Sequence, residues 1–137
     1  MASPETVTTN SEDETFALGK LLAASTHPGT FVLLHGDLGA GKTAFVRGMA
    51  AGLGCDPEDV SSPTFVLIQH YKGRTPLVHV DLYRLESAAV DDLGLEELAN
   101  GAVVAVEWAE RLPRPLDDTV TVRIEDLGGD RRKISIE

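Results

Sequence analysis

The chain has 137 residues, of which 42% are hydrophobic and 25% are charged, as is typical of one soluble globular domain. These values exclude a collagen-like, low-complexity or wholly disordered chain. The formal net charge of −10 argues against extensive binding of a nucleic-acid backbone by this chain alone, because like charges repel.

The first third of the chain predicts a short strand, a helix and a buried strand. Residues 1–10 are polar and rich in threonine, and we expect an extension or one short strand there. Ser11 and Glu14 have the spacing of a capping box, and the apolar residues that follow them share one helical face as far as His27–Gly29. Thr30–His35 is a continuous apolar run, which predicts a strand buried on both faces of a sheet.

A glycine-rich loop over Gly36–Lys42 and a helix from Thr43 to Gly54 come next. Pro57–Pro63 has the composition of a loop. Two strands are then predicted, at Phe65–Tyr71 and Leu77–Tyr83.

The last third combines one interrupted helix with three strands. Leu85–Leu98 has helical spacing that Gly94 interrupts, and Ala102–Val106 reads as a further buried strand. Thr119–Ile124 and Lys133–Ile136 alternate as a final pair of strands. The order of elements predicts one compact α/β domain, a mixed β-sheet flanked by helices, over residues 11–137.

The strongest motif is Gly36-Asp37-Leu38-Gly39-Ala40-Gly41-Lys42-Thr43, a complete match to G-x-x-x-x-G-K-[ST]. Its glycines let successive backbone N–H groups point at phosphate oxygens, and the following helix N-terminus adds partial positive charge. In this motif the lysine reaches the β- and γ-phosphates and the hydroxyl binds Mg²⁺. The motif follows a predicted buried strand and precedes a predicted helix, as a phosphate-binding P-loop requires.

Two acidic residues follow apolar strands. Asp81 comes after Leu77–Val80, and Glu107 comes after Val103–Val106. Each carboxylate could simply cap its strand or pair with a surface arginine. Beside a phosphate loop we favour a role at Mg²⁺ or water, because ligands collect at the carboxyl ends of sheet strands.

Four motifs occur together in this chain, namely His35–Thr43, Ser62–Phe65, Asp81–Leu85 and Glu107-Trp108. In this order and spacing they resemble the TsaE (formerly YjeE) family, the ATPase of bacterial tRNA threonylcarbamoyladenosine biosynthesis. The resemblance covers Thr15–Ile136. It implies an ATP-binding, slowly hydrolysing P-loop protein that acts with TsaB and TsaD, which place threonylcarbamoyl on the adenosine next to the anticodon of ANN-reading tRNAs. Contact with tRNA would then be indirect.

The resemblance also implies roles for individual residues. The nucleotide would contact Thr15, Gly39, Ala40, Gly41, Lys42, Thr43 and Arg132. Thr43 and Glu107 would lie at Mg²⁺, and Lys42, Asp81 and Glu107 would form the catalytic set, with Asp81 near the metal or the attacking water. Ala44 departs from the family, where a second Thr or Ser is usual, and this leaves one α-phosphate contact open.

Several residues keep two interpretations. Ser62–Thr64 is either a turn fixed by its proline or a γ-phosphate-sensing switch, which the resemblance favours. Trp108 either fills the sheet edge or contributes to a nucleotide or partner surface. Tyr83 and Arg84 either face the site or pack and contact solvent, and Arg131–Lys133 is either a solvated strand end or a phosphate contact.

The histidines and the cysteine are expected to have structural roles only. His35, His70 and His79 do not form a spaced ligand set and are expected to be partly buried strand histidines. Cys55 is the only cysteine, which excludes an intrachain disulfide and a cysteine-built metal site. It is expected only to pack near a helix end.

The main alternative function is a small-molecule kinase, since kinases share the phosphate loop. Arg111 and Arg114 around Pro113 form the only stretch that resembles a kinase lid, and it is very short. A GTPase is disfavoured because no Asn-Lys-x-Asp guanine motif is present. Asp91–Gly94 matches D-x-x-G by letters only, since no apolar strand precedes it.

The sequence also bears on location. Lys20 is the first basic residue and no apolar stretch follows Met1–Glu5, so we expect no secretory signal. The longest apolar runs are far below the roughly 18 residues that span a bilayer. We therefore expect a soluble, cytoplasmic protein without membrane contact.

Overall fold

The computed structural model describes residues 5–36, 41–60, 68–83, 85–86, 89–90 and 93–137. Its centre is a seven-stranded sheet with the order β1-β7-β6-β2-β5-β4-β3. The strands in chain order are β1 (Glu5–Thr9), β2 (Phe31–His35), β3 (Ile68–Tyr71), β4 (Leu77–Asp81), β5 (Val103–Glu107), β6 (Thr119–Gly128) and β7 (Arg131–Ile136).

The sheet is mixed, as the sequence predicts. Strands β6, β2, β5 and β4 run parallel in the middle. Antiparallel strands complete both sides, with β3 on β4 and the β7–β1 pair on β6. Because the four central strands run the same way, their carboxyl ends lie along one edge of the sheet, where α/β proteins bind ligands.

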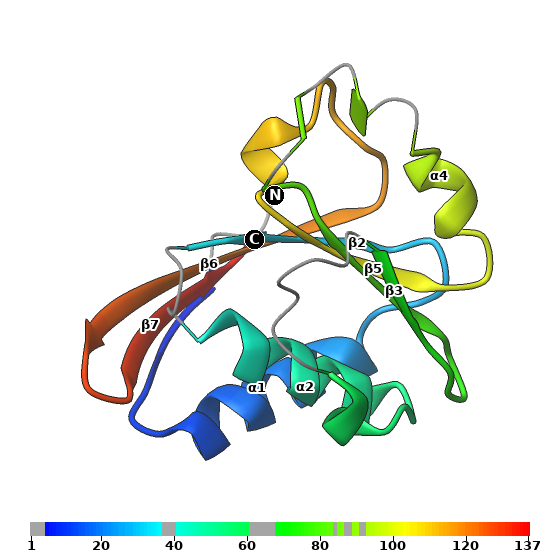
Figure 1. Cartoon of the computed structure of the whole chain (residues 1–137). Helices are drawn as coiled ribbons and strands as arrows, with labels where there is room; N and C mark the ends of the chain where they lie inside the picture. The colour runs from blue at the N-terminus through cyan, green and yellow to red at the C-terminus, as the bar shows by residue number, and fades with distance from the viewer. Residues whose placement is uncertain (1–4, 37–40, 61–67, 84, 87–88, 91–92) are drawn as a thin grey trace.

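Helices cover both faces of the sheet (Figure 1). Helices α1 (Glu12–Ala24) and α2 (Lys42–Gly52) lie together on one face, and the short α4 (Leu95–Leu98) lies on the other. Two 3₁₀ turns, η1 (Pro57–Asp59) and η2 (Ala109–Arg111), complete the described helical elements. None of these helices has the length and apolar character that crossing a membrane requires.

Alternation along the central strands divides the core into two clusters. Val32 and Leu34 of β2 pack with α1 and α2, together with Val103 and Ala105 of β5. The intervening residues, such as Val104, pack on the α4 side. Strands buried on both faces explain the continuous apolar runs of the sequence. Side chains that share a face with Ala105 therefore point to the side of the P-loop helix.

Most predicted boundaries lie close to the observed ones. Ser11 caps α1, since its hydroxyl accepts the Glu14 amide at 3.1 Å, and Glu14 accepts the Asn10 amide in return. The predicted N-cap at Ser11 is confirmed, but Glu14 accepts the amide of Asn10, one residue before the N-cap, and not the amide of Ser11 that a capping box uses. The final hairpin is longer than predicted because pairing continues past a bulge between Asp126 and Gly128. Gly94, the predicted interruption, has φ +67, and among the described residues 89–90 before it and Leu95–Leu98 after it are helical.

Cys55 packs, as expected. Its buried thiol donates to the carbonyls of Tyr71 and Thr75 at 3.7 and 3.6 Å. Burial raises the pKa of this thiol, so the reactive thiolate is disfavoured in the folded protein.

Helices α1 and α2 pack with their backbones in close approach. A Cβ placed on Gly48 would lie 2.0 Å from the carbonyl oxygen of Phe16, and one on Gly19 would lie 2.2 Å from that of Phe45. Only hydrogen fits at either position. This packing fixes the P-loop helix against the helix that carries Thr15.

We expect Gly48→Ala to lower the free energy of unfolding by about 1–3 kcal/mol, the usual cost of overpacking. Helix propensity alone predicts the opposite sign, since alanine stabilises a helix by roughly 1 kcal/mol relative to glycine. Urea unfolding followed by circular dichroism measures the difference. A raised unfolding midpoint would show that the two helices do not pack this closely.

Candidate nucleotide site

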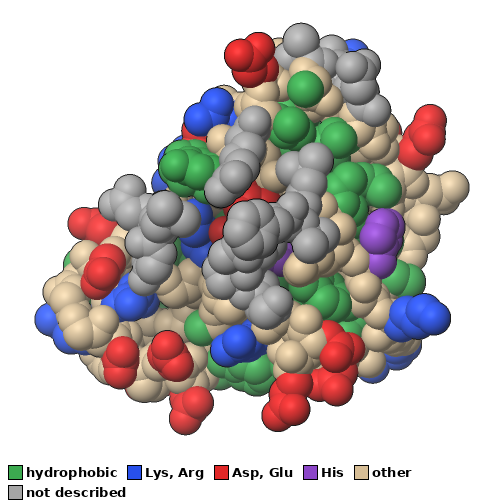
Figure 2. Space-filling view, in the orientation of Figure 1, with side chains coloured by type: hydrophobic (Ala, Val, Ile, Leu, Met, Phe, Trp, Pro, Cys, Tyr) green, Lys and Arg blue, Asp and Glu red, His purple; other side chains and the backbone are tan. Residues whose placement is uncertain are grey.

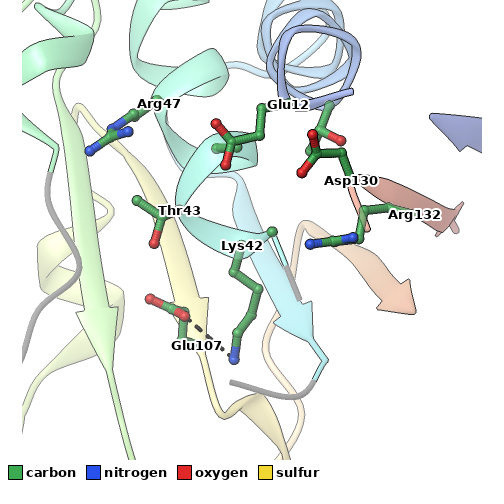
Figure 3. A pocket seen from close by; sticks show the side chains of 10 residues that line it. Glu12, Lys42, Thr43, Arg47, Glu107, Asp130 and Arg132 are labelled. Carbon is green, nitrogen blue, oxygen red and sulfur yellow. Dashed lines mark ion pairs between the residues drawn. The ribbon is translucent and has the colours of Figure 1, made fainter. Parts of the chain in front are cut away.

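One pocket lies at the carboxyl edge of the parallel strands, between α1, the start of α2 and the β6–β7 hairpin (Figure 3). Six of its lining residues are predicted site residues: Thr15, Gly41, Lys42, Thr43, Glu107 and Arg132. The tertiary structure thus brings together residues from four separate parts of the chain. Gly39 and Ala40 of the predicted phosphate loop lie outside the described residues, as do Ser62–Phe65 and Arg84.

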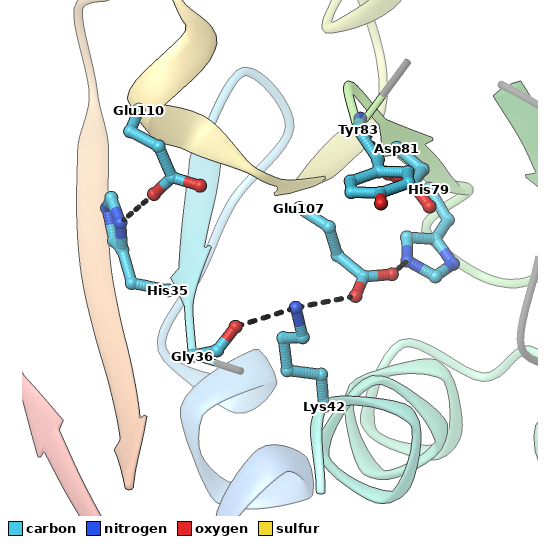
Figure 4. Close-up of polar contacts among 8 residues, drawn as sticks. All are labelled: His35, Gly36, Lys42, His79, Asp81, Tyr83, Glu107 and Glu110. Atoms are coloured by element: carbon cyan, nitrogen blue, oxygen red, sulfur yellow. Dashed lines mark hydrogen bonds and ion pairs between the residues drawn. The ribbon is translucent and has the colours of Figure 1, made fainter. Parts of the chain in front are cut away.

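Lys42 is the first residue of α2 and is only 5% exposed. Its ammonium donates to the carbonyl of Gly36 at 3.0 Å and lies 3.5 Å from Glu107 Oε1 (Figure 4). Gly36 directly follows β2, and Glu107 is the last residue of the neighbouring β5. The P-loop lysine is therefore held at the ends of two parallel strands.

Glu107 is a buried carboxylate with two partners. Oε1 faces Lys42, and Oε2 lies 2.6 Å from His79 Nε2. Burial raises the pKa of the Glu107 carboxyl, but the hydrogen bond and the charge interaction with His79, and then the charge of Lys42, outweigh this effect, so the pKa lies below its usual range. The side chain therefore carries a negative charge at neutral pH.

Arg132 closes the pocket beside the start of α2. A Cβ on Gly41 would lie 3.2 Å from Arg132 Nε, and Gly41 has φ +97, a left-handed conformation that favours glycine. The Arg132 guanidinium donates to Asp126 at 3.1 Å and to the carbonyl of Gly129 at 2.7 Å. The hairpin thus orients this arginine toward the pocket that the α2 N-terminus borders.

Of the predicted site residues Thr15 and Asp81, the first lines the pocket and the second does not. Thr15 lines the pocket in the first turns of α1, and its buried hydroxyl pairs with that of Thr9 at 2.7 Å. Asp81 ends β4 in register with Glu107, but it does not line the pocket, and its Oδ1 accepts the Tyr83 amide at 2.9 Å. The nucleotide and catalytic roles of these two residues remain predictions.

The pocket contains groups that fit a nucleoside triphosphate with Mg²⁺. A buried lysine and a helix N-terminus supply positive potential for phosphate, while the Thr43 hydroxyl and the Glu107 carboxylate are oxygen ligands of the kind Mg²⁺ prefers. Among the described residues no group of three or more His, Cys, Asp or Glu side chains could hold a metal ion unaided. Mg²⁺ in nucleotide sites needs only one or two carboxylates, because phosphates supply further ligands.

Comparison with known proteins identifies the family. The model of the family described as "Threonylcarbamoyl adenosine biosynthesis protein TsaE" matches residues 9–134. The chain belongs to the TsaE family.

Known members of the family align with this chain over most of the length of both proteins. The tRNA threonylcarbamoyladenosine biosynthesis protein TsaE of Bacillus subtilis is 44% identical over 126 residues, which span 90% of this chain and 78% of that protein. The protein of the same description from Rickettsia conorii is 43% identical over 132 residues, 94% of this chain and 75% of the relative. A crystal structure of Bacillus subtilis YdiB aligns with a TM-score of 0.75 and 37% identity, covering 99% of this chain and 86% of that one.

Trp108, next to Glu107 in this TsaE-family chain, lies beside the P-loop lysine. Lys42 Nζ is 5.3 Å from the centre of the indole ring, within the range of a cation–π contact. The ring of Tyr83 also packs against the indole, at a centroid distance of 4.8 Å and an interplanar angle of 45°. Trp108 has φ +60, a conformation that is uncommon for a bulky residue. The indole thus contacts Lys42 while it also packs against the core on the α4 side, and its role at a nucleotide or partner surface remains a prediction.

Four residues of the site were not predicted from the sequence. Glu12 of α1, Arg47 of α2 and Asp130 of the turn between β6 and β7 line the pocket, and no motif marks them. His79 could have been found, because it lies two residues before Asp81 and strand alternation places both on one face. It was instead expected to be a histidine without a role.

The kinase-like arginines lie elsewhere. Arg111 belongs to η2 and donates to the carbonyl of Leu85 at 3.4 Å, and Arg114 lines a separate pocket beside α4. Neither lines the pocket around Lys42. His35 pairs with Glu110 at 2.9 Å near the end of β2.

Proposed function

We propose that this chain binds ATP with Mg²⁺ and hydrolyses the ATP slowly, in the biosynthesis of threonylcarbamoyladenosine on tRNA. The observation that carries the proposal is the buried Lys42 at the start of α2, held between the end of β2 and Glu107 at the end of β5. In a P-loop, the lysine at this position of the motif binds the β- and γ-phosphates. The family membership supplies the tRNA pathway.

Each residue of the pocket has a distinct proposed task. Lys42 and the backbone N–H groups at the start of α2 bind and orient the β- and γ-phosphates. Gly39 and Ala40 are proposed to complete the phosphate loop. Thr15 and Arg132 border the rest of the nucleotide. Positioning and electrostatic stabilisation of this kind supply most of the catalysis in phosphoryl transfer.

Thr43 and Glu107 are the residues proposed to hold Mg²⁺. The metal would supply charge neutralisation at the phosphate oxygens. Asp81 lies on the neighbouring strand in register with Glu107, and we propose that it orients the attacking water or the metal's water ligands. The protein's own contribution is to keep these oxygen atoms fixed before the nucleotide arrives.

We propose that TsaB and TsaD are the partners and that tRNA is reached through them. The net charge of −10 supports an indirect role. Acidic side chains lie at several separate places on the face shown in Figure 2. In this proposal Trp108, which lies beside Lys42, and Ser62–Phe65 report the bound phosphate to a neighbouring protein.

Stimulation by partners tests this function. We expect weak phosphate release from ATP by the purified chain and a higher rate when TsaB and TsaD are added, since partners can complete or order the site. Association should be stronger with ATP than with ADP, and partners should raise nucleotide affinity reciprocally. Equal association in all nucleotide states without stimulation would overturn the coupling, as would tight, salt-sensitive tRNA binding by this chain alone. Transfer of the phosphoryl group to a small molecule in place of water would favour the alternative function of a small-molecule kinase.

We also expect ATP to bind more tightly than GTP. The chain has no Asn-Lys-x-Asp motif to recognise guanine. Competition of both nucleotides, each with Mg²⁺, against a fluorescent ATP analogue measures the preference. GTP binding as tightly as ATP would contradict this specificity.

A further inference from the structure

His79 is a nearly buried histidine on the site face of β4. It is 3% exposed and lies in register with Ala105 of β5, two residues before Asp81. Side chains two apart on a strand share a face, so His79 shares its face with Asp81, and likewise Ala105 with Glu107. The small Ala105 side chain lies opposite His79, and the imidazole reaches diagonally to the carboxylate of Glu107 (Figure 4).

The direction of this hydrogen bond follows from the chemistry of its two groups. His79 Nε2 and Glu107 Oε2 are 2.6 Å apart, and an ionised carboxylate can only accept. Nε2 must therefore carry the hydrogen. The other ring nitrogen, Nδ1, is buried and has no partner among the described residues.

Because of this hydrogen bond, the two carboxylate oxygens of Glu107 have different partners. Oε2 is bound to His79 on the inner side, and Oε1 lies 3.5 Å from Lys42 Nζ on the pocket side. The planar carboxylate cannot rotate about its own axis without breaking the bond to His79. One oxygen thus stays presented to the pocket.

We infer that His79 is a positioning residue, which holds Glu107 by an Nε2–H···Oε2 hydrogen bond so that Oε1 faces Lys42 and the Mg²⁺–nucleotide. The inference rests on the proposed function for the Mg²⁺–nucleotide itself. Partners that orient a metal-ligating side chain affect metal affinity strongly even though they do not touch the metal. A histidine that merely fills the core would have no such effect.

The first test is the position of the hydrogen, which needs no nucleotide. We expect ¹⁵N chemical shifts of the folded wild-type protein to show a hydrogen on Nε2 of His79. A hydrogen on Nδ1 with a bare Nε2 would overturn the inference. This measurement is independent of whether the chain binds ATP.

The second test compares His79→Leu with His79→Gln, because the glutamine amide can donate from about the position of Nε2. The binding constant of a non-hydrolysable ATP analogue is measured by calorimetry over a series of Mg²⁺ concentrations. We expect His79→Leu to need about tenfold more Mg²⁺ for half of the full affinity, within the usual effect of losing such a partner. His79→Gln should restore most of the wild-type dependence. Affinity without Mg²⁺ should change little in either variant.

His70→Leu is the matched control, since His70 is an exposed histidine on the adjacent β3. It should keep the wild-type Mg²⁺ dependence. Equal Mg²⁺ dependence of wild type and His79→Leu would overturn the inference, as would equal defects in the Leu and Gln variants. If His79→Leu fails to fold, the Gln variant and the ¹⁵N shifts still decide. Absence of Mg²⁺-dependent binding by the wild type would refute the proposed function instead.

Discussion

Lys42→Ala is expected to lower the rate of ATP hydrolysis by about 10²–10³-fold, the usual effect of removing one group that stabilises developing charge. Lys42 is the buried cation at the start of α2, and alanine cannot place a charge beside the phosphates. Thr43→Ala should have a similar effect through Mg²⁺, because it removes one proposed oxygen ligand. Phosphate release at saturating ATP and Mg²⁺ is the measurement.

The fold should survive the lysine substitution, because Glu107 keeps its hydrogen bond to His79. Circular dichroism and thermal unfolding check this point. Lys72→Ala, which changes an exposed lysine just after β3, is the matched control and should hydrolyse ATP at the wild-type rate. A folded Lys42→Ala protein with normal hydrolysis would refute the site assignment.

Glu107→Gln should also lower hydrolysis by about a hundredfold, since metal and charge contributions of this size are usual in phosphoryl transfer. The amide keeps the shape of the side chain and can still accept from His79. It loses the charge that holds Lys42 at 3.5 Å and that favours Mg²⁺. We therefore expect a weaker Mg²⁺ dependence of nucleotide binding, with binding in the absence of Mg²⁺ retained or tightened because Lys42 is released for phosphate.

Glu110→Gln is the control for this variant. Its side chain is 52% exposed and pairs with His35 at 2.9 Å, three residues beyond Glu107. Hydrolysis and Mg²⁺ dependence should match those of the wild type. Wild-type hydrolysis by Glu107→Gln would mean that this carboxylate has no part in the reaction, and Asp81 would then be the carboxylate to test.

The fold class and the phosphate loop could be predicted from local sequence. Each of these signals is contained in a short segment: the N-cap at Ser11, the apolar runs of β2 and β5, and the loop that ends in Gly41-Lys42-Thr43. A continuous apolar run predicts a strand covered on both faces whatever lies beside it. These signals are local, so one sequence was enough for them.

The ends of the elements were less certain. The final hairpin extends to Gly128 because β6 and β7 pair across a bulge, and pairing between strands depends on both of them. Leu85–Leu98 had helical spacing, and among its described residues 89–90 and Leu95–Leu98 are helical, with Gly94 between them at φ +67. Helical spacing alone does not state where packing against the sheet begins and ends.

The sequence by itself determined the α/β class, the P-loop and the two acidic strand ends, because each follows from periodicity or from a compact motif. Only the tertiary structure decided which of those acids faces the loop. The strand order puts β5 beside β2, so Glu107 meets Lys42, while Asp81 on the next strand lies outside the pocket lining. The same order gave His79 its partner across β4 and β5. Contacts between residues 28 or more positions apart depend on which strands pair. Alternation along a strand indicates which side chains share a face, but no local pattern encodes the order of the strands in the sheet.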